Sequence, residues 1–292
     1  MKKFTQVMLI LSGVLASVGV VCMLVAFGMG LTTDTLGRIF RDGRFSFDSG
    51  DLKISFGEDT EEDLGGDFES GITITEGTTG EVTYHVEELC QDLDIEFGAG
   101  LLTVYYADVE NIQITKKNIP NLKVKVKDGK LVIREEDEIN VDLDDIEDRS
   151  LCIILPSNTK FEEVDLEIGA SKADIRDILA KEISINVGAG EAEISHVTTG
   201  TFDLEVGAGQ ATVAQLTVDK LNVEAGIGQA TIAVNGVEEE YNYAIECGIG
   251  RVEIGSYSYG GLGAMKSVYN HELTKEINAE CGIGEIIVKF IE

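Results

Sequence analysis

The sequence is poor in positive charge. It contains 23 Lys and Arg residues against 53 Asp and Glu residues, so its formal net charge is −30. A surface this acidic repels phosphate backbones, which argues against nucleic-acid binding and against flat docking on an anionic membrane. The same charge is compatible with cations, with basic partners or with simple solubility.

Catalytic and metal-binding motifs are also scarce. The three histidines, His85, His196 and His271, lie far apart, and the five cysteines form no CxxC pair. Neither G-x-S-x-G nor H-E-x-x-H occurs. We therefore predict a non-enzymatic protein with no catalytic residue, no cofactor and no dedicated metal site.

Proline and tryptophan are almost missing. The chain has two Pro and no Trp, but 33 Gly, in a length of 292 residues that can bury a large core. Few Pro and many Gly, with abundant Val and Ile, are typical of β-rich proteins with many tight corners.

Charge is absent from one N-terminal run, Val7–Leu31, which is 25 residues long. A membrane-spanning helix needs about 20 apolar residues. Lys2 and Lys3 precede the run, which predicts a cytoplasmic N-terminus and a chain that continues outside the cell. We predict a cytoplasmic stub and single-pass anchor in residues 1–31. The alternative is a cleaved signal peptide, although signal peptides usually hold only about 7–15 apolar residues.

An acidic segment follows the anchor. Residues 58–69 hold seven acidic side chains and no basic one. Like charges repel and extend such a segment, so we predict an acidic flexible linker over residues 32–80.

A repeat dominates residues 81–292. Seven segments combine an alternating strand pattern with a Gly-x-Gly motif, and in one of them Ser171 replaces the second glycine. From Gly169 to Gly226 the first glycines recur every 19 residues, and the next gaps are 22 and 34. A fixed period of about 20 residues predicts a solenoid. The predicted corner residues are Gly98, Gly100, Gly169, Gly188, Gly190, Gly207, Gly209, Gly226, Gly228, Gly248, Gly250, Gly282 and Gly284.

The unit FDLEVGAGQATV, which begins at Phe202, illustrates how each repeat is built. Apolar residues occupy every second position up to Val206 and are expected to point inward. The alternation then shifts by one position, so that the next inward residue of the following strand is Ala211. Such a slip needs a bulge or corner, where glycine supplies unusual backbone angles. We also expect Gly207 and Gly209 to approach the backbone of the rungs above and below, rather than a ligand. Stacked units then line up like residues about 4.8 Å apart. One predicted inward column runs, in chain order, through Ile168, Val187, Val206, Ala225, Cys247 and Cys281.

The predicted fold is all-β: a mainly parallel β-solenoid with rungs of about 19 residues. Residues 81–160 form an irregular β region, and residues 161–292 form regular repeats with an insertion at 255–273. Residues 175–181 look helical alone, but the repeat places Ile178 opposite Val197 and Ile183 opposite Phe202, so we predict strands there.

The segment IILPSNTKFEEVDLEIGA from Ile153, a strand ending in Pro, precedes the regular Gly-cornered rungs. Together with an apolar N-terminal segment, this pattern resembles the bacterial "putative adhesin" family over about residues 81–292. The resemblance implies an extracytoplasmic, right-handed, mainly parallel β-solenoid of the cell envelope, with a tie to envelope stress. The molecular function of that family is largely uncharacterised, so the resemblance implies little chemistry.

Two ligand-binding interpretations of the glycine motif fail. GAGQAT has the look of a phosphate loop, but Thr212 stands where a dinucleotide fingerprint needs Gly or Ala, a strand follows, and the motif recurs. A calcium β-roll needs Asp two residues after the last Gly, where Ala211 and Ala230 stand.

Carboxylates recur at one outward position. The column contains Glu96, Glu167, Glu205, Glu224, Glu246 and Glu280, with Asn186 interrupting it. It is either a solvated face, since neighbours repel by only about 1 kcal/mol in water, or a weak divalent-cation column centred on Glu205, Glu224, Glu246 and Glu280.

Two further features stay open. Cys247 and Cys281 occupy the same inward position in two repeats. They are either small apolar core residues or the two halves of a disulfide. The insertion carries Tyr257, Tyr259 and Tyr269, which suit recognition of a protein or sugar. The insertion could instead fold over the end of the solenoid and cover an unpaired edge.

We therefore predict a single-pass membrane protein with an extracytoplasmic solenoid. It would serve as a non-enzymatic binding or scaffold module of a bacterial envelope. The partners would be an envelope protein or a cell-wall or surface polymer, and not nucleic acid. The alternative is a polysaccharide-active β-helix enzyme, which would need clustered carboxylates with shifted pKa values in a groove.

Overall fold

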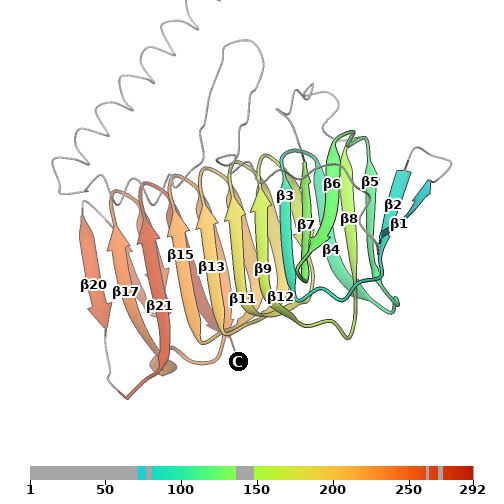
Figure 1. Cartoon of the computed structure of the whole chain (residues 1–292). Helices are drawn as coiled ribbons and strands as arrows, with labels where there is room; N and C mark the ends of the chain where they lie inside the picture. Colours follow the sequence, from blue (N-terminus) through green and yellow to red (C-terminus); the bar gives the residue numbers. More distant parts are fainter. Residues whose placement is uncertain (1–71, 77–80, 136–147, 261–262, 269–271, 292) are drawn as a thin grey trace, which may run out of the picture. The chain divides into compact units, whose positions relative to one another are not determined.

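The computed structural model describes residues 72–76, 81–135, 148–260, 263–268 and 272–291 (Figure 1). The predicted anchor, most of the predicted linker and Tyr269 lie outside these residues. No helix in the described part of the chain is long and apolar enough to cross a membrane.

The described residues form two sheets that share the strand β11 (Ile178–Val187). Its first two residues pair with β12 in one sheet, and residues 182–187 pair with β13 in the other. In spatial order the first sheet contains β6 (Leu122–Lys127), β7 (Lys130–Glu135), β3 (Asp92–Phe97), β9 (Phe161–Ile168), β11, β13 (Thr201–Val206), β15 (Lys220–Ala225), β21 (Lys275–Cys281), β17 (Tyr241–Cys247) and β20 (Ala264–Val268). The second contains β1 (Ile72–Glu76), β2 (Glu81–Val86), β5 (Ile112–Lys117), β8 (Ser150–Pro156), β4 (Leu101–Ala107), β10 (Lys172–Ile175), β12 (Glu191–Thr198), β14 (Gln210–Thr217), β16 (Gln229–Asn235), β22 (Glu285–Ile291), β18 (Arg251–Ile254) and β19 (Tyr257–Gly260).

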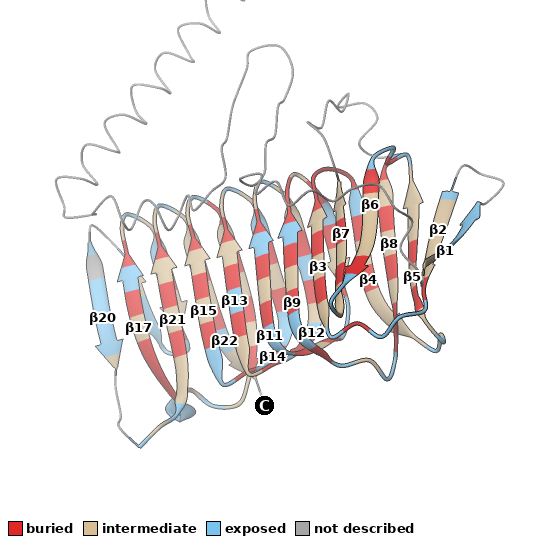
Figure 2. Cartoon of the chain, viewed as in Figure 1, coloured by how far each residue is buried: buried red, intermediate tan, exposed pale blue. Residues whose placement is uncertain are grey.

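Each rung of the regular repeat has one strand in each sheet, joined at a glycine corner, and neighbouring rungs pair in parallel. Phe202 of β13 pairs with Ile183 on one side and with Leu221 on the other, and all three are buried. Alternate residues of every rung are buried, which gives the banded strands of Figure 2. The predicted parallel solenoid is therefore confirmed, and so is the assignment of strands rather than a helix to residues 175–181.

The stacking order departs from the predicted chain order near the C-terminus. Strand β21 lies between β15 and β17, and β22 lies between β16 and β18. The inward column therefore continues from Ala225 to Cys281 and then to Cys247. The long gap between Gly248 and Gly282 provides enough chain to pass the last rung and return beneath it, which a 19-residue rung lacks.

The other end repeats this arrangement. Strand β3 lies between β7 and β9, although β7 follows it in the chain. Strand β4 lies in the same way between β8 and β10. At both ends, then, one rung is enclosed between two rungs that both precede it or both follow it in the chain.

Antiparallel strands cover both ends of the stack. Strands β20 and β19 pair with β17 and β18 at one end, and β6 and β5 pair with β7 and β8 at the other. A tight turn at Asp128-Gly129 joins β6 to β7, with φ of 53° and 82°. Strand β1 was not predicted: its residues fall within the segment expected to be a linker.

Candidate functional site

The glycine corners stack directly on one another through the backbone. The amide of Gly207 donates to the carbonyl of Val187 at 2.8 Å, and Gln210 donates to Gly190 at 2.9 Å. These bonds use main-chain donors that a phosphate loop would turn towards a ligand. The corner amides therefore bind the backbone of the neighbouring rung rather than a ligand.

Of the two physical reasons predicted for these glycines, close approach to the neighbouring backbone is confirmed at Gly207 and Gly209, and unusual backbone angles are wrong at all corner glycines but one. Among the predicted corner glycines, all of which the structure describes, Gly100 alone has a positive φ, of +130°. From Gly188 onward the corner glycines are needed because the stacked corners approach closely. A Cβ on Gly190 would lie less than 3.0 Å from the Ser171 carbonyl oxygen, whereas one on Gly188 would lie 3.2 Å from the Gly169 carbonyl oxygen.

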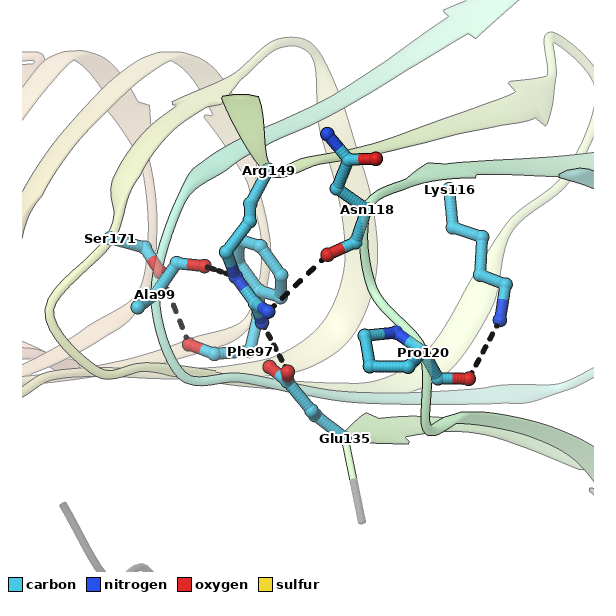
Figure 3. Close-up of polar contacts among 8 residues, drawn as sticks. All are labelled: Phe97, Ala99, Lys116, Asn118, Pro120, Glu135, Arg149 and Ser171. Carbon is cyan, nitrogen blue, oxygen red and sulfur yellow. Dashed lines mark hydrogen bonds and ion pairs between the residues drawn. The ribbon is translucent and has the colours of Figure 1, made fainter. Parts of the chain in front are cut away.

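The first corner differs from the later ones in burial and contacts. Its central residue, Ala99, is buried, whereas Ala189 and Ala208 are exposed at later corners. Ser171 occupies the second-glycine position of the next rung, and its hydroxyl donates to the Phe97 carbonyl at 3.3 Å (Figure 3). The unusual φ of Gly100 gives this corner another shape, which accommodates the Ser171 side chain.

A buried arginine holds the first corner in place. Arg149 donates through Nε to the Ala99 carbonyl at 3.0 Å and through a terminal nitrogen to the Asn118 carbonyl at 3.3 Å (Figure 3). The same guanidinium forms an ion pair with Glu135, and both side chains are only 7% exposed. This group joins strand β7, the start of β8 and the loop after β5, so its role is structural.

The acidic column forms as predicted along the outer side of the first sheet. Glu167 pairs in register with Glu96, and Glu205 pairs with Glu224. Asn186 lies between the two groups, because it pairs with Glu167 on one side and with Glu205 on the other. Beyond Glu224 the column continues through Glu280 to Glu246.

Two cations on β7 lie beside one end of this column. Lys130 Nζ lies 3.1 Å from Asp94 Oδ2 and 3.6 Å from Asp165 Oδ2. Arg134 Nε lies 3.6 Å from Glu96 Oε2. Strand β7 thus offsets the carboxylates of β3 and β9.

Burial and the neighbouring carboxylates shift the pKa of Glu96. Burial, and next the charge of Glu167, raise the pKa of Glu96 to about 7, against the lowering effect of Arg134. Burial, and next the charge of Glu163, also raise the pKa of Asp165. These carboxyl groups accept protons more readily than ordinary surface acids.

A shallow polar groove lies farther along the same face. Its volume is about 310 Å³. Each of four neighbouring rungs contributes two polar residues to its lining, and these residues form two columns that run across the rungs. In one column Asn278 Nδ2 donates to Asn222 Oδ1 at 2.9 Å, and Asn222 in turn donates to Asp203. The other column supplies carboxylates to the same groove. The groove-lining polar residues are Ser184, Asn186, Asp203, Glu205, Asn222, Glu224, Asn278 and Glu280.

The carboxylates form pairs rather than a metal cage. Within the described ranges, no group of three or more His, Cys, Asp or Glu side chains is arranged to hold a metal ion. Cation binding by Glu205, Glu224, Glu246 and Glu280 stays a prediction, and the geometry would limit it to weak binding by carboxylates on adjacent rungs.

Cys247 and Cys281 lie opposite one another, and both thiols are free and buried. Burial, and next the neighbouring Cys247, raise the pKa of Cys281 to about 12. Protonated and enclosed, the two thiols serve as small apolar core residues in this structure.

The tyrosine-bearing insertion is tied to the solenoid. Tyr257 stacks on Tyr259 with ring centroids 6.2 Å apart, and Tyr243 lies 5.8 Å from Tyr257. Glu238 accepts hydrogen bonds from the Tyr243 hydroxyl at 3.2 Å and from the Ser256 amide at 2.9 Å. The insertion therefore covers the edges of β17 and β18, and recognition of a partner by its tyrosines stays a prediction.

A family model described as Toastrack DUF4097 matches residues 69–259, which is more than half of the chain. The chain belongs to the Toastrack DUF4097 family. The match includes β1, whose residues precede position 81. The resemblance to the "putative adhesin" family is confirmed.

Several solved structures are similar to this Toastrack chain. One, described as a putative cell adhesion protein from Clostridium sporogenes ATCC 15579, is 23% identical, with a TM-score of 0.39 over 75% of this chain and 98% of that one. A putative adhesin from Bacteroides fragilis NCTC 9343 is 14% identical, with a TM-score of 0.42 over 74% of this chain and 100% of that one. A putative lipid binding protein from Parabacteroides distasonis ATCC 8503 is 13% identical, with a TM-score of 0.32 over 75% and 99%. No curated protein matches the chain significantly.

Sequence reasoning missed several residues of this Toastrack surface. Lys130 and Arg134 lie in the irregular region, where no repeat predicts their register. Asn222 and Asn278 occupy equivalent positions in two repeats, so the amide column was visible in the alternation pattern. The isoleucines at the centres of three corners, Ile227, Ile249 and Ile283, were likewise visible in the sequence.

Proposed function

We propose that the chain is a non-enzymatic binding module of a bacterial envelope. In this proposal Val7–Leu31 anchors it in the membrane and the solenoid lies outside the cell. The ligand face is the outer side of the first sheet around the groove. The family assignment, the uncharged N-terminal run and the two Lys before it support the proposal.

The observation that carries the proposal is the regularity of the groove. Carboxylate and amide groups recur there at the same positions of adjacent rungs, about 4.8 Å apart. A surface with evenly spaced acceptors and donors suits an extended partner, such as a cell-wall or surface polymer or a segment of an envelope protein. Divalent cations would bind the same carboxylates weakly.

Calcium titration tests the ligand face. Isothermal titration of the full chain with Ca²⁺ should give a millimolar dissociation constant, weakened by Glu205→Gln with Glu224→Gln. The matched control is Glu191→Gln with Glu193→Gln, on the second sheet. Absence of binding at millimolar Ca²⁺, or equal loss in both pairs of variants, would contradict the cation proposal.

Cysteine labelling in intact cells tests the location. Gln215 is exposed on β14 and Val213 is buried two residues earlier. A membrane-impermeant maleimide should label the Gln215→Cys variant more strongly than wild type, whereas the Val213→Cys variant should match wild type. Labelling of the Gln215→Cys variant only after cell lysis would show that the solenoid faces the cytoplasm.

One observation favours the enzymatic alternative. Glu96 has a pKa of about 7 beside the carboxylate of Glu167, and a polysaccharide-cleaving general acid needs such a raised pKa. In this alternative Glu96 protonates the leaving oxygen of a glycosidic bond, and a water molecule supplies the oxygen that bonds to the anomeric carbon and the proton that restores the acid. Release of reducing sugars from envelope polysaccharides that stops in the Glu96→Gln variant would favour the enzyme over the binding module.

A further inference from the structure

An exposed apolar row runs along the corners at the C-terminal end of the stack. Its members are Ile227, Ile283 and Ile249, the central residues of three Gly-x-Gly motifs, with exposed fractions of 68%, 49% and 45%. We name these three residues the isoleucine ridge. At the four earlier corners the same position holds Ala99, Ala170, Ala189 and Ala208.

The three isoleucines lie in consecutive rungs although they are scattered in the chain. The amide of Ile283 donates to the Gly226 carbonyl at 2.8 Å, and the amide of Ile249 donates to the Gly282 carbonyl at 2.8 Å. Ile283 therefore lies between Ile227 and Ile249, with about 4.8 Å from rung to rung. The insertion of β21 into the stack is what makes the row continuous.

The rim of the ridge is acidic. Within three positions of the isoleucines lie Glu224, Glu280, Glu246, Glu285 and Arg251, so four negative charges oppose one positive charge, a net of −3. The positive charge is already engaged, because Arg251 Nε donates to Glu285 Oε1 at 2.7 Å and another of its nitrogens lies 3.0 Å from Glu253 Oε1.

We propose that the isoleucine ridge is a docking surface for a protein segment whose apolar side chains are flanked by Lys or Arg. Single exposed apolar residues are ordinary on protein surfaces, whereas contiguous ones mark interaction sites. An apolar centre with a charged rim is the usual construction of a protein interface. Here the acidic rim repels an anionic lipid surface and a second copy of the same ridge, and it attracts a basic segment.

This inference goes beyond the proposed function, since it needs neither the membrane anchor nor calcium binding. The probe is a fluorescent amphipathic peptide of Leu and Lys, compared with a peptide of equal charge in which Ser replaces Leu. Binding to the full chain in zwitterionic nanodiscs would be followed by fluorescence anisotropy. Empty nanodiscs give the background, and about 0.3 M salt suppresses non-specific attraction.

The sequence itself supplies the matched variant. The triple variant Ile227→Ala, Ile283→Ala and Ile249→Ala places at each ridge corner the residue found at the other four corners, so the fold should persist, as circular dichroism would verify. The control is Leu89→Ala, at another exposed apolar residue. A second triple variant, Glu224→Gln, Glu280→Gln and Glu246→Gln, neutralises the rim.

We expect the Leu–Lys peptide to bind wild type at least about tenfold more tightly than the Ser–Lys peptide. The isoleucine variant should lose that difference, the glutamine variant should weaken it, and Leu89→Ala should keep it. Equal binding of both peptides, or unchanged binding in the isoleucine variant, would overturn the proposal. So would an isoleucine variant that loses self-association in sedimentation or binding to phosphatidylglycerol vesicles, because the occupant would then be a second copy or a lipid surface.

Discussion

Cys247 pairs in register with Cys281, and Cys281 separates it from Ala225, the equivalent residue of the preceding repeat. The C-terminal segment of the chain is therefore an internal rung. The rung formed by β17 and β18 contacts the rest of the stack through β21 and β22, so it depends on residues near the end of the chain.

C-terminal truncation tests this order. Deletion of residues 274–292 removes β21 and β22 and leaves β17 and β18 without their parallel neighbours. We expect loss of cooperative thermal unfolding in the C-terminal part of the solenoid and aggregation, measured by circular dichroism and light scattering. Stacking in chain order would instead predict a protein shortened by one rung that still unfolds cooperatively.

Substitution by alanine at the two glycines of one corner should lower the free energy of unfolding by unequal amounts. Gly190→Ala forces a Cβ against the Ser171 carbonyl, whereas Gly188→Ala adds one at 3.2 Å from the Gly169 carbonyl oxygen. We expect Gly190→Ala to lower the free energy of unfolding by about 1–3 kcal/mol, the usual cost of overpacking, and Gly188→Ala by less. Urea unfolding compares them, and equal effects would show that close approach is not the constraint.

Stability should fall as the pH rises from about 4.5 to about 7. The pKa of Glu96 is raised to about 7 from an ordinary value near 4.5, so in this range the folded state binds more protons than the unfolded state. The contribution of Glu96 is complete below pH 4.5 and is lost as the pH passes 7, with a slope of at most about 1.4 kcal/mol per pH unit. The raised pKa of Asp165 acts in the same direction.

Substitution isolates the share of Glu96. The Glu96→Gln variant cannot ionise, so its unfolding free energy should exceed that of wild type increasingly between pH 5 and pH 8. Glu193→Gln, at an exposed residue, is the control and should follow wild type. Parallel curves for wild type and Glu96→Gln over this range would contradict the assignment.

Removal of one partner of the buried pair Glu135 and Arg149 should lower the free energy of unfolding more than removal of both. Glu135→Leu leaves the Arg149 guanidinium buried without its carboxylate, which typically costs roughly 3–5 kcal/mol. In the double variant Glu135→Leu with Arg149→Met, the charge is gone and only the hydrogen bonds to Ala99 and Asn118 are lost. Urea unfolding should show a smaller loss for the double variant, and additive losses would argue against a coupled pair.

Most of the solenoid was predictable because its signals are local and repeated. The alternation in FDLEVGAGQATV defines which residues of a rung are buried, and the 19-residue period defines which residues pair. This is why the pairing of Ile178 with Val197 could be predicted against a helical local pattern. The acidic column followed from the same register.

The order of the last rungs was not predictable from these signals. Ala225, Cys281 and Cys247 are all small and apolar, so the core accepts them in either order and the pattern does not distinguish them. The contacts of Lys130, Arg134 and Arg149 depend on strands outside the repeat, where no period relates one residue to another. Close approach of the corner backbones could be predicted from the repeat, whereas the ordinary φ angles of most corner glycines could not, because a pattern of residue types does not define backbone angles.

The most direct test of the binding-module account is photo-cross-linking in living cells from the polar groove. A photoreactive residue at Asp203 lies in the groove, and one at Gln215 lies exposed on the second sheet as the control. The account predicts one defined cross-linked product from position 203, a protein or a surface polymer, that is missing from position 215. Identical products from both positions, or none from position 203, would contradict it.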